Sequence, residues 1–544
     1  MTARYGMVVD LNRCVGCQTC TIACKQANDT PPGVQWRKVL DVEYGKFPSV
    51  ERLFLVTGCQ HCANPSCVPV CPTGATKQRA DGLVTMDYDT CIGCGYCAVA
   101  CPYQARTIVH ETKGYYGEPT QQEVQTSHAD RVGVANKCTF CIDRIDEAQV
   151  LQLIPGVDPE VTPACATSCI TQAITFGDFA DPASNVSNLA KENKFFQMHA
   201  ELGNDPQIKY LYEIPATLSG SPLSDEDANE ESMSDLSNPL VGKPQAFWDY
   251  RAAMNFILGG MASGFALVAF LLFSFEVIDA NELGVFNLVA GMIMACGLFF
   301  VFLKIGRKLR FLNVLLRPQS SWMTRETWCV AIFYPAIILG FLFENIYAHT
   351  IAGFAAGGFL ISQARILFAA KGIPSWRAPL IPWMITFSGV YEGIALIGLF
   401  SPLAGMHLQS HLLLMCSTGI IFGLINALLF AMYCQRAKSD GIGPLSRRDI
   451  RALRLPVIGF TQILPVCLMF FTLLTPAIGL FSFLLGAALI VIGGAYWKLI
   501  LITKACHVQS FEIPMMPKRG SGERAAPERM GLNLSQLANK GAAR

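Results

Sequence analysis

The sequence predicts a protein of two parts, an α+β cysteine-rich domain followed by an all-α bundle of transmembrane helices. Two observations support this division. Sixteen of the 22 cysteines lie within residues 1–169, and long apolar runs fill residues 248–503. The whole chain is 52% hydrophobic and only 15% charged, a balance that is unusual for a soluble protein. The net charge of +1 and the absence of a concentrated basic face argue against nucleic acid as a partner.

The sixteen cysteines form four groups of four with short spacings. The groups are Cys14, Cys17, Cys20 and Cys24; Cys59, Cys62, Cys67 and Cys71; Cys91, Cys94, Cys97 and Cys101; and Cys138, Cys141, Cys165 and Cys169. Groups one and three have the spacing in which three thiolates bind one iron–sulfur cluster and the fourth binds another. Pro72 and Pro102 follow two of the last cysteines, as in bacterial ferredoxins. The sequence therefore predicts four cubane [4Fe–4S] clusters in two ferredoxin-like pairs.

Disulfides and zinc are the alternatives for a segment so rich in cysteine. Disulfides explain an even number of cysteines, but not four repeats of two- and three-residue spacing. Zinc sites need only two C-x2-C pairs and often include histidine. The repeated blocks of four cysteines therefore favour iron–sulfur clusters, and with them electron transfer.

Short strands are expected next to the cysteine loops. Residues 7–10 lead into group one, residues 82–86 lead into group three, and residues 171–177 follow group four. The repetition of loop, cluster and strand predicts a duplicated ferredoxin-like fold over residues 1–216. Such loop-rich domains bury little apolar area, so the clusters must supply much of the stability.

Two other segments have compositions that oppose folding. Residues 217–247 are rich in Ser, Pro and Asn and strongly acidic before Lys243, which predicts a flexible acidic linker. Residues 504–544 are polar and rich in Gly, Ala and Arg, which predicts a mobile C-terminal tail.

Eight apolar segments between residues 248 and 503 are each long enough to cross a bilayer. They cover residues 253–277, 285–303, 327–347, 350–369, 380–400, 411–433, 456–474 and 478–502. A buried soluble core is the alternative, but eight successive Gly-rich spans with Trp and Tyr at their edges favour a membrane bundle.

The charges of the connecting segments predict the orientation of the bundle. The connections after spans two, four and six contain many Lys and Arg residues, for example in 304–310 and 447–454. The connections after spans one, three, five and seven contain none. Positive connections face the cytoplasm, so the cluster domain and both termini are expected on the cytoplasmic side of the bacterial inner membrane. No apolar or twin-arginine signal precedes Asp10, although an exported partner could carry a signal for both.

With these features in hand, the chain resembles two subunits of dimethyl sulfoxide reductase-family molybdoenzymes, fused end to end. Residues 1–216 resemble the four-cluster electron-transfer subunit, and residues 248–503 resemble the quinone-linked membrane anchor. The first resemblance rests on CVGCQTCTIACKQAND (14–29), CQHCANPSCVPVCPTGA (59–75), CIGCGYCAVACPYQAR (91–106), and KCTFC with ACATSC (137–141 and 164–169). The second rests most clearly on KIGRKLRFLNVLLRPQSSWMTRE (304–326).

The resemblance implies that the groups exchange ligands, which gives four ligand sets. Set one is Cys14, Cys17, Cys20 and Cys169; set two is Cys138, Cys141, Cys165 and Cys24; set three is Cys59, Cys62, Cys67 and Cys101; set four is Cys91, Cys94, Cys97 and Cys71. A full complement of cysteines favours four [4Fe–4S] clusters over a [3Fe–4S] variant. In the family, groups one and four face the molybdenum subunit, and groups two and three lie towards the membrane.

The resemblance also implies a quinone site near the basic end of the bundle. Its candidate residues are Pro72, Thr73, Gly74, Ala75, Lys77, Arg79, Lys304, Arg307, Gln363 and Arg365. Lys304 stands where relatives often have His, and with Arg307 it could donate to a quinone carbonyl. The alternative is that both are ordinary interfacial anchors, and that Arg365 extends to the membrane surface.

Few other polar residues are expected inside the membrane. Glu392 lies deep in span five and could either conduct protons or make a helix–helix contact. His349, His407 and His411 lie at the end of the bundle without basic residues, so we expect no haem.

These features predict an electron-transfer and membrane-anchor subunit with no catalytic residues of its own. It would pass electrons between a molybdopterin-containing catalytic subunit and membrane ubiquinone or menaquinone, with sulfite to quinone as the favoured direction. The alternatives are a quinol-oxidising subunit of a dimethyl sulfoxide, polysulfide or thiosulfate reductase, and an ion-translocating redox module. No dinucleotide fingerprint occurs outside the apolar spans.

Overall fold

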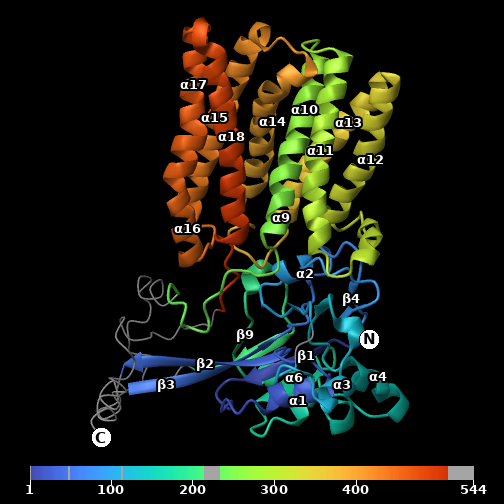
Figure 1. Ribbon diagram of the computed structural model, residues 1–544. Helices are drawn as coiled ribbons and strands as arrows, with labels where there is room; N and C mark the ends of the chain where they lie inside the picture. Colours follow the sequence, from blue (N-terminus) through green and yellow to red (C-terminus); the bar gives the residue numbers. More distant parts are fainter. Residues whose placement is uncertain (1, 47–48, 112–113, 214–232, 512–544) are drawn as a thin grey trace, which may run out of the picture.

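The computed structural model describes residues 2–46, 49–111, 114–213 and 233–511. The described chain has two parts along one long axis, a helical bundle and a smaller cluster domain that contains the strands (Figure 1). Residues 217–232 of the predicted linker and 512–544 of the predicted tail lie outside the described residues.

Short strands form the framework of the cluster domain. A four-stranded sheet has the order β8-β1-β10-β9, in which β1 is parallel to β10 and antiparallel to β8. Three two-stranded sheets pair β2 with β3, β4 with β5, and β6 with β7. The strands are β1 (Tyr5–Asp10), β2 (Arg37–Lys46), β3 (Ser49–Gly58), β4 (Thr76–Gln78), β5 (Val84–Met86), β6 (Thr107–Ile108), β7 (Ala135–Asn136), β8 (Ile174–Asp178), β9 (Phe195–Phe196) and β10 (Ile208–Leu211). Strands β1, β5 and β8 occur where the sequence predicts them.

The helices of this domain are short because the cysteine loops interrupt the chain. The α-helices are α1 (Thr19–Ala27), α2 (Tyr96–Val99), α3 (Gln121–Gln125), α4 (Ile142–Leu151), α5 (Ala164–Thr167) and α6 (Asn185–Glu192). The 3₁₀ turns are η1 (Ala129–Arg131), η2 (Pro159–Val161) and η3 (Ala200–Leu202). Helices α1, α2 and α5 each carry cysteines, so these small elements position the sulfur atoms.

Eight helical segments of the described chain are long and apolar enough to cross a membrane. They are Tyr250–Ser274, Ala280–Lys304, Trp322–Phe343, Ile346–Phe368, Ile381–Ala404, Leu408–Arg436, Pro444–Leu474 and Gly479–Thr503. Each overlaps one predicted span. The seventh begins twelve residues before its predicted start at 456, because the basic helix α16 (Pro444–Leu455) continues into it.

The remaining elements complete the bundle. The α-helices are α9 (Tyr250–Met254), α10 (Gly260–Ser274), α11 (Ala280–Lys304), α12 (Trp322–Phe343), α13 (Ile346–Phe368), α14 (Ile381–Ala404), α15 (Leu408–Arg436), α17 (Leu464–Leu474) and α18 (Pro476–Thr503). The 3₁₀ segment η5 (Lys308–Leu315) connects α11 to α12. Two π-helical segments, η4 (Asn255–Gly259) and η6 (Pro456–Ile463), interrupt the first and seventh spans. Such π-helical turns are often found at functional sites.

One hydrophobic core joins the two parts. It contains Tyr96 and Val99 of the third cysteine group together with Trp248, Trp376 and Trp497 of the bundle. The rings of Trp248 and Trp376 stack at a centroid distance of 5.5 Å. Because fully burying a large apolar side chain is worth about 1.5–3 kcal/mol, packing as well as the chain connection holds the parts together.

The described ends of the predicted linker and tail pack together at this junction. A backbone bridge joins Pro244 to His507. The amide of Phe511 donates to the carbonyl of Leu240 at 2.9 Å, and both side chains are buried. The predicted end of the linker at residue 247 and the predicted start of the tail at residue 504 therefore lie within one packed region.

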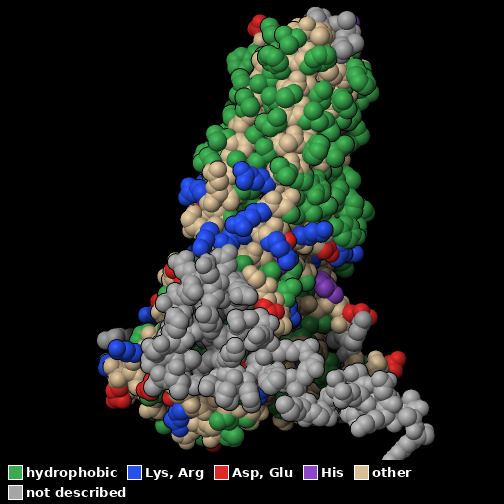
Figure 2. Space-filling model, turned by 90° about the vertical axis from the view of Figure 1, so that its left-hand side faces the viewer, with side chains coloured by type: hydrophobic (Ala, Val, Ile, Leu, Met, Phe, Trp, Pro, Cys, Tyr) green, Lys and Arg blue, Asp and Glu red, His purple; other side chains and the backbone are tan. Residues whose placement is uncertain are grey.

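Lys and Arg side chains gather at the end of the bundle next to the cluster domain (Figure 2). Beyond this basic band the visible face of the bundle is almost entirely hydrophobic. The space-filling view thus shows the charge asymmetry that the connecting segments predict, with the cluster domain on the basic side.

Candidate iron–sulfur sites and their junction with the membrane helices

The four cysteine groups share one backbone feature. The residue before the second cysteine is left-handed in every group, with φ of 68° at Gly16, 41° at His61, 71° at Gly93 and 58° at Phe140. The amides of Gly93 and Phe140 each donate to the sulfur of the first cysteine of their group at 3.4 Å. A left-handed conformation costs a residue other than glycine about 1–2 kcal/mol, so His61 and Phe140 hold a strained turn that the cluster loop requires. The groups therefore repeat one loop geometry.

The structure brings together the side chains of sets three and four around two cavities. One cavity is lined by Cys59, Cys62, Cys67 and Cys101. The other is lined by Cys71, Cys91, Cys94 and Cys97. In each case the fourth cysteine comes from the neighbouring group, as the resemblance implies. Ligation itself remains a prediction.

Sets one and two lie in the other half of the domain. Cys14 is close enough to Cys17 and Cys169 for their thiolate charges to interact. The amide of Asn28 reaches the sulfurs of Cys24 and Cys141 at 3.8 and 3.6 Å, which places members of set two side by side. These members of sets one and two therefore lie near one another, and their ligation of common clusters stays a prediction.

Two buried arginines test whether iron–sulfur clusters fit these sites. Arg37 lies beside Cys165, with Nη2 3.8 Å from its sulfur, and Arg106 lies among the cysteines of sets three and four. Within the described residues, neither guanidinium forms an ion pair with a carboxylate, and each has buried N–H groups without a partner. A buried cation without a counter-charge is very costly. An anionic thiolate-bound cluster would supply that counter-charge, so the surroundings fit the group.

A single metal ion fits less well. In the described ranges, no three His, Cys, Asp or Glu side chains are close enough together to hold one ion. Sets three and four instead line small cavities, which suits a polynuclear cluster better than tetrahedral zinc.

A histidine connects the two halves of the domain. The amide of Val84 donates to His61 Nδ1 at 3.1 Å, so His61 Nε2 carries the proton and donates to the carbonyl of Cys138 at 3.0 Å. The imidazole also stacks on Phe140 at 3.8 Å. Because Cys138 belongs to set two and His61 lies between two cysteines of set three, this contact spans the two pairs. Burial and the charge of Lys137 hold the pKa of His61 well below 6.5, so the ring is neutral.

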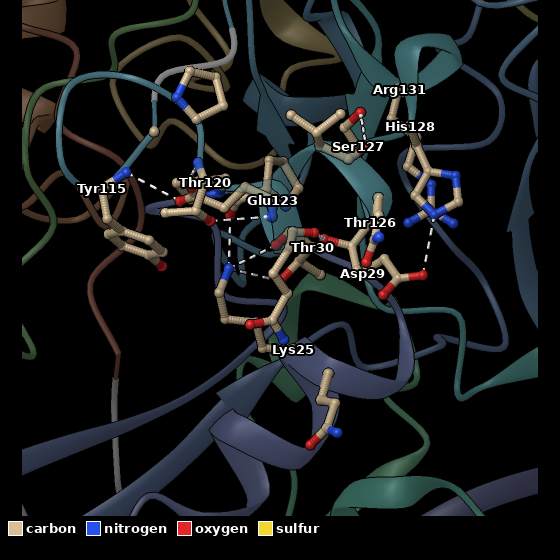
Figure 3. Close-up of a pocket in the computed structure, with 18 of the residues that line it drawn as sticks. Lys25, Asp29, Thr30, Tyr115, Thr120, Glu123, Thr126, Ser127, His128 and Arg131 are labelled. Atoms are coloured by element: carbon tan, nitrogen blue, oxygen red, sulfur yellow. Dashed lines mark hydrogen bonds and ion pairs between the residues drawn. The ribbon is translucent and has the colours of Figure 1, made fainter.

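Set one lies at the surface of the domain. Cys17 is exposed, and the apolar residues Val15, Ile22 and Ile170, which are close in sequence to cysteines of set one, are exposed by 56–71%. A pocket formed by the end of α1 and residues 114–132 includes Ile22 in its lining (Figure 3).

Polar side chains of this pocket form hydrogen bonds with the backbone of the pocket's own walls. Lys25 donates to the carbonyls of Thr30 and Pro31, and Glu123 accepts from the amides of Tyr115 and Thr120. These contacts are visible in Figure 3, where most labelled polar groups bond to the wall beside them. Such an arrangement suits surface recognition better than catalysis.

Set four lies against the membrane bundle. The indole of Trp248 donates to the carbonyl of Cys94 at 3.0 Å, and the Tyr96 hydroxyl donates to the carbonyl of Ile366 in α13 at 2.9 Å. The amide of Arg307 donates to the carbonyl of Ile92 at 3.1 Å. The sets therefore extend from an exposed end at set one to a buried end at the helices.

The predicted quinone-site residues after Cys71 divide into two groups. Pro72, Thr73, Gly74 and Ala75 lie at the junction, where the Pro72 carbonyl accepts from Thr324 of α12 at 3.3 Å. Lys77 lies 4.0 Å from Asp87, and Arg79 forms ion pairs with Asp81 and with Asp146 of α4. These two cations are engaged with carboxylates of the cluster domain.

The predicted residues of the anchor also differ in position. Lys304 is buried at the end of α11 near Asp249, and Gln363 is fully buried in α13. Arg307 donates to the carbonyl of Ala129. Arg365 is exposed, 5.8 Å from the ring of Trp322, which fits a residue at the membrane surface.

The structure adds an acid that sequence reasoning did not single out. Glu326 is the last residue of the anchor motif 304–326, and its carboxyl is buried in the second turn of α12. Asn255 of η4 donates to it at 3.3 Å, and the Gln363 amide lies beside it. Tyr96, between two cysteines of set four, is near enough to interact with its charge. The sequence signal that could have identified Glu326 was an acidic residue at the start of a helix that begins at the membrane interface.

Comparison with known proteins gives a consistent picture. A family model described as a 4Fe-4S dicluster domain matches residues 50–116. The chain is 39% identical over 221 residues to a putative dimethyl sulfoxide reductase iron-sulfur subunit of Halobacterium salinarum. It is 37% identical over 224 residues to a sulfite dehydrogenase subunit of Allochromatium vinosum, and 36% identical over 232 residues to the iron-sulfur cluster-binding subunit of menaquinone reductase of Nitratidesulfovibrio vulgaris. Each match covers 38% of this chain and 78%, 82% and 88% of the respective relative.

Proposed function

Because the chain belongs to the family of iron–sulfur subunits of dimethyl sulfoxide reductase-type oxidoreductases, we propose that it conducts electrons between a molybdopterin-containing catalytic subunit and a membrane quinone. Four [4Fe–4S] clusters held by sets one to four would form the path. The clusters supply the one-electron chemistry. The residues of this chain would bind the clusters, set their reduction potentials and exchange protons with the quinone.

The observation that carries this proposal is the placement of the two end sets. Set one lies beneath exposed apolar residues, whereas set four contacts the helices through Trp248, Tyr96 and Arg307. Electron carriers arranged from an exposed surface to a membrane face suit transfer between a docked partner and a lipid-soluble acceptor.

Glu326 is our candidate for the proton-exchanging residue of the quinone site. Quinone reduction requires protons as well as electrons, and a buried acid next to set four can supply one where the electron arrives. Asn255 and Gln363 provide polar groups that could orient a quinone carbonyl. The relative from Nitratidesulfovibrio vulgaris, whose name refers to menaquinone, supports a quinone as the partner of this end.

The exposed end is proposed as the docking surface for the catalytic subunit. Val15, Ile22 and Ile170 are exposed apolar residues close in sequence to cysteines of set one, and Ile22 also lines the pocket of Figure 3. Partner contact would cover the exposed cysteine and exclude water from the first electron-transfer step.

Sulfite oxidation coupled to quinone reduction is the favoured direction, with the cluster domain in the cytoplasm. The relative named sulfite dehydrogenase supports the substrate, and the basic band next to the cluster domain supports the side. A topology reporter fused after Glu344 should report the far side of the membrane, and one fused after Ser439 should report the cytoplasm. The opposite pattern would overturn the orientation.

Cysteine variants in the assembled complex test the electron path. Cys17→Ser should slow cluster reduction by substrate, whereas Cys94→Ser should leave that reduction intact and stop transfer to a quinone analogue. Both steps are followed by electron paramagnetic resonance (EPR) during single turnover. Equal loss of both steps in both variants would argue against a linear path from set one to set four.

Substitution of the buried acid tests the quinone site. Glu326→Gln should lower quinone reduction by about a hundredfold, the lower end of what a proton-transfer residue contributes, with all clusters still reducible. Glu344→Gln, an exposed acid at the far end of α12, is the matched control and should be unaffected. Normal quinone reduction in Glu326→Gln would remove this residue from the proposal.

A further inference from the structure

A second buried acid in the membrane part is paired with a cation that sequence reasoning overlooked. Glu392 of α14 lies 2.7 Å from Lys498 of α18, and both side chains are at most 1% exposed. Ser388 donates to the other carboxylate oxygen of Glu392 at 2.6 Å. Eleven residues separate Glu392 from the start of α14, which places it about 16 Å along the helix, near the bilayer centre.

This pair lies at the end of a line of buried polar groups that leads to Glu326. The line begins at Glu326, continues through Asn255 and Gln363, and approaches Lys498 across Gly260 of α10. Gln363 donates to the carbonyl of Asn255 at 2.8 Å. A Cβ on Gly260 would lie 3.0 Å from Gln363 Oε1 and 3.3 Å from Lys498 Nζ, so these two atoms face the same small space.

Two features of the line indicate more than a structural contact. Gln363 Oε1 and Asn255 Oδ1 are buried acceptors without a partner among the described atoms. Asn255 also starts the π-helical segment η4, and its backbone carbonyl accepts from Gln363 rather than serving only the helix. Unpaired buried acceptors and a charged pair in an apolar bundle are each costly, and for that reason such groups inside a membrane usually mark a functional path.

We propose that Glu392 and Lys498 form a second proton-binding site, which exchanges one proton with the quinone bound beside Glu326. The inference rests on the proposed function. Before the quinone is reduced, Glu392 is a neutral carboxylic acid and Lys498 is an ammonium group. When the quinone takes up two electrons, delivered one at a time through the cluster that set four would hold, one proton comes from the Glu326 carboxyl and one from the Glu392 carboxyl. Both protons end on the two quinone oxygens, and Glu392 returns to a carboxylate paired with Lys498. Quinol oxidation reverses each transfer.

A double-substitution series in the assembled complex, reconstituted into liposomes, separates proton exchange from a structural role. Glu392→Gln and Lys498→Met should each slow quinone reduction at least fivefold, with set four reduced at the normal rate. The double variant contains no unpaired buried charge, so its fold should be retained. Proton exchange predicts that the double variant stays slow, whereas recovery of the normal rate would show a purely structural pair and overturn the proposal. Glu344→Gln and Lys504→Met, both exposed, are the matched controls.

A third variant tests the route without removing any titratable group. Gly260→Ala places a methyl group between Gln363 Oε1 and Lys498 Nζ and should slow quinone reduction as the Glu392 variant does. Infrared difference spectra recorded on quinone reduction should show a carboxyl band that disappears in Glu392→Gln. An unchanged band in that variant would contradict proton release from Glu392.

The failure of this inference can be told apart from failure of the proposed function. If Glu326→Gln stops quinone reduction while the Glu392, Lys498 and Gly260 variants are normal, the second proton site is wrong and the quinone site stands. If no variant of the complex, including Glu326→Gln, affects quinone reduction, the proposed quinone site itself is wrong.

Discussion

The indole Nε1 of Trp248 donates a hydrogen bond of 3.0 Å to the backbone carbonyl of Cys94. This bond joins the first residues of the bundle to a cysteine of set four. The same indole stacks on Trp376, which donates to the carbonyl of Leu501 in α18. This aromatic stack therefore helps to fix the position of set four relative to the membrane helices.

Replacing Trp248 tests this attachment. Trp248→Phe keeps much of the stack but leaves the buried Cys94 carbonyl without its donor, which should cost about 1–3 kcal/mol. The expected result is a lower thermal midpoint of the complex and a broadened EPR signal of set four. Trp328→Phe is the control, because its indole also donates to a carbonyl, that of Leu315, but is 45% exposed. Equal losses in both variants would contradict a special role of the Cys94 bond.

The buried arginines should tune the reduction potentials of separate cluster pairs. Arg106 lies among the cysteines of sets three and four, and Arg37 lies beside those of set two and close enough to Cys20 of set one for its charge to act there. Each loss of about 1.4 kcal/mol of charge stabilisation lowers a one-electron potential by about 59 mV. Arg106→Gln should therefore lower the potentials of sets three and four, and Arg37→Gln those of sets one and two, in EPR-monitored titrations. Arg79→Gln is the surface control, and equal shifts of all four potentials would refute the pairwise assignment.

Two glycines with similar backbone angles should differ in their tolerance of a side chain. Gly93, with φ of 71°, is enclosed by the backbones of Gly133 and Gly306, whereas Gly33, with φ of 75°, has no atom near its Cβ position. Gly33→Ala should cost only the backbone strain of about 1–2 kcal/mol. Gly93→Ala should in addition displace the junction and abolish the EPR signal of set four. A normal EPR signal of set four in Gly93→Ala would show that the backbones of Gly133 and Gly306 can move to accommodate the added methyl group, and would contradict the prediction.

The packing of residues 504–511 should weaken in acid. Burial lowers the pKa of His507 below its usual 6.5, with Arg448 adding to this effect and Asp449 opposing it. Since the folded pKa is depressed, the contribution of the neutral ring is complete above pH 6.5. It is lost as the pH falls below that value, by up to about 1.4 kcal/mol per pH unit.

Hydrogen exchange of residues 504–511 measures this effect. Exchange should be faster at pH 5.5 than at pH 7.5, after correction for the intrinsic rate. His507→Asn keeps a polar contact to Ser446 but does not titrate, so its corrected exchange should not depend on pH. An equal pH dependence in this variant would assign the effect to another group.

The sequence could predict features that short spacings encode. The cysteine groups are recognisable because a cluster loop needs its ligands two or three residues apart, and the spans are recognisable because a bilayer needs about 20 apolar residues. Lys498 was missed because a single cation in a long apolar run resembles a residue near a helix end. Glu326 was missed because the basic residues around it are more conspicuous.

The sequence by itself determined the four closely spaced groups of cysteines, the eight apolar segments long enough to cross a membrane and the basic side of the bundle. Only the tertiary structure decided that the cysteines of sets three and four line common cavities, that Arg37 and Arg106 lie buried among the cysteines, and that Glu392 meets Lys498. The physical reason is the separation along the chain. Glu392 and Lys498 are 106 residues apart, and Arg37 and Cys165 are 128 apart. Contacts of this kind depend on how loops and helices pack, which no local pattern of residues encodes.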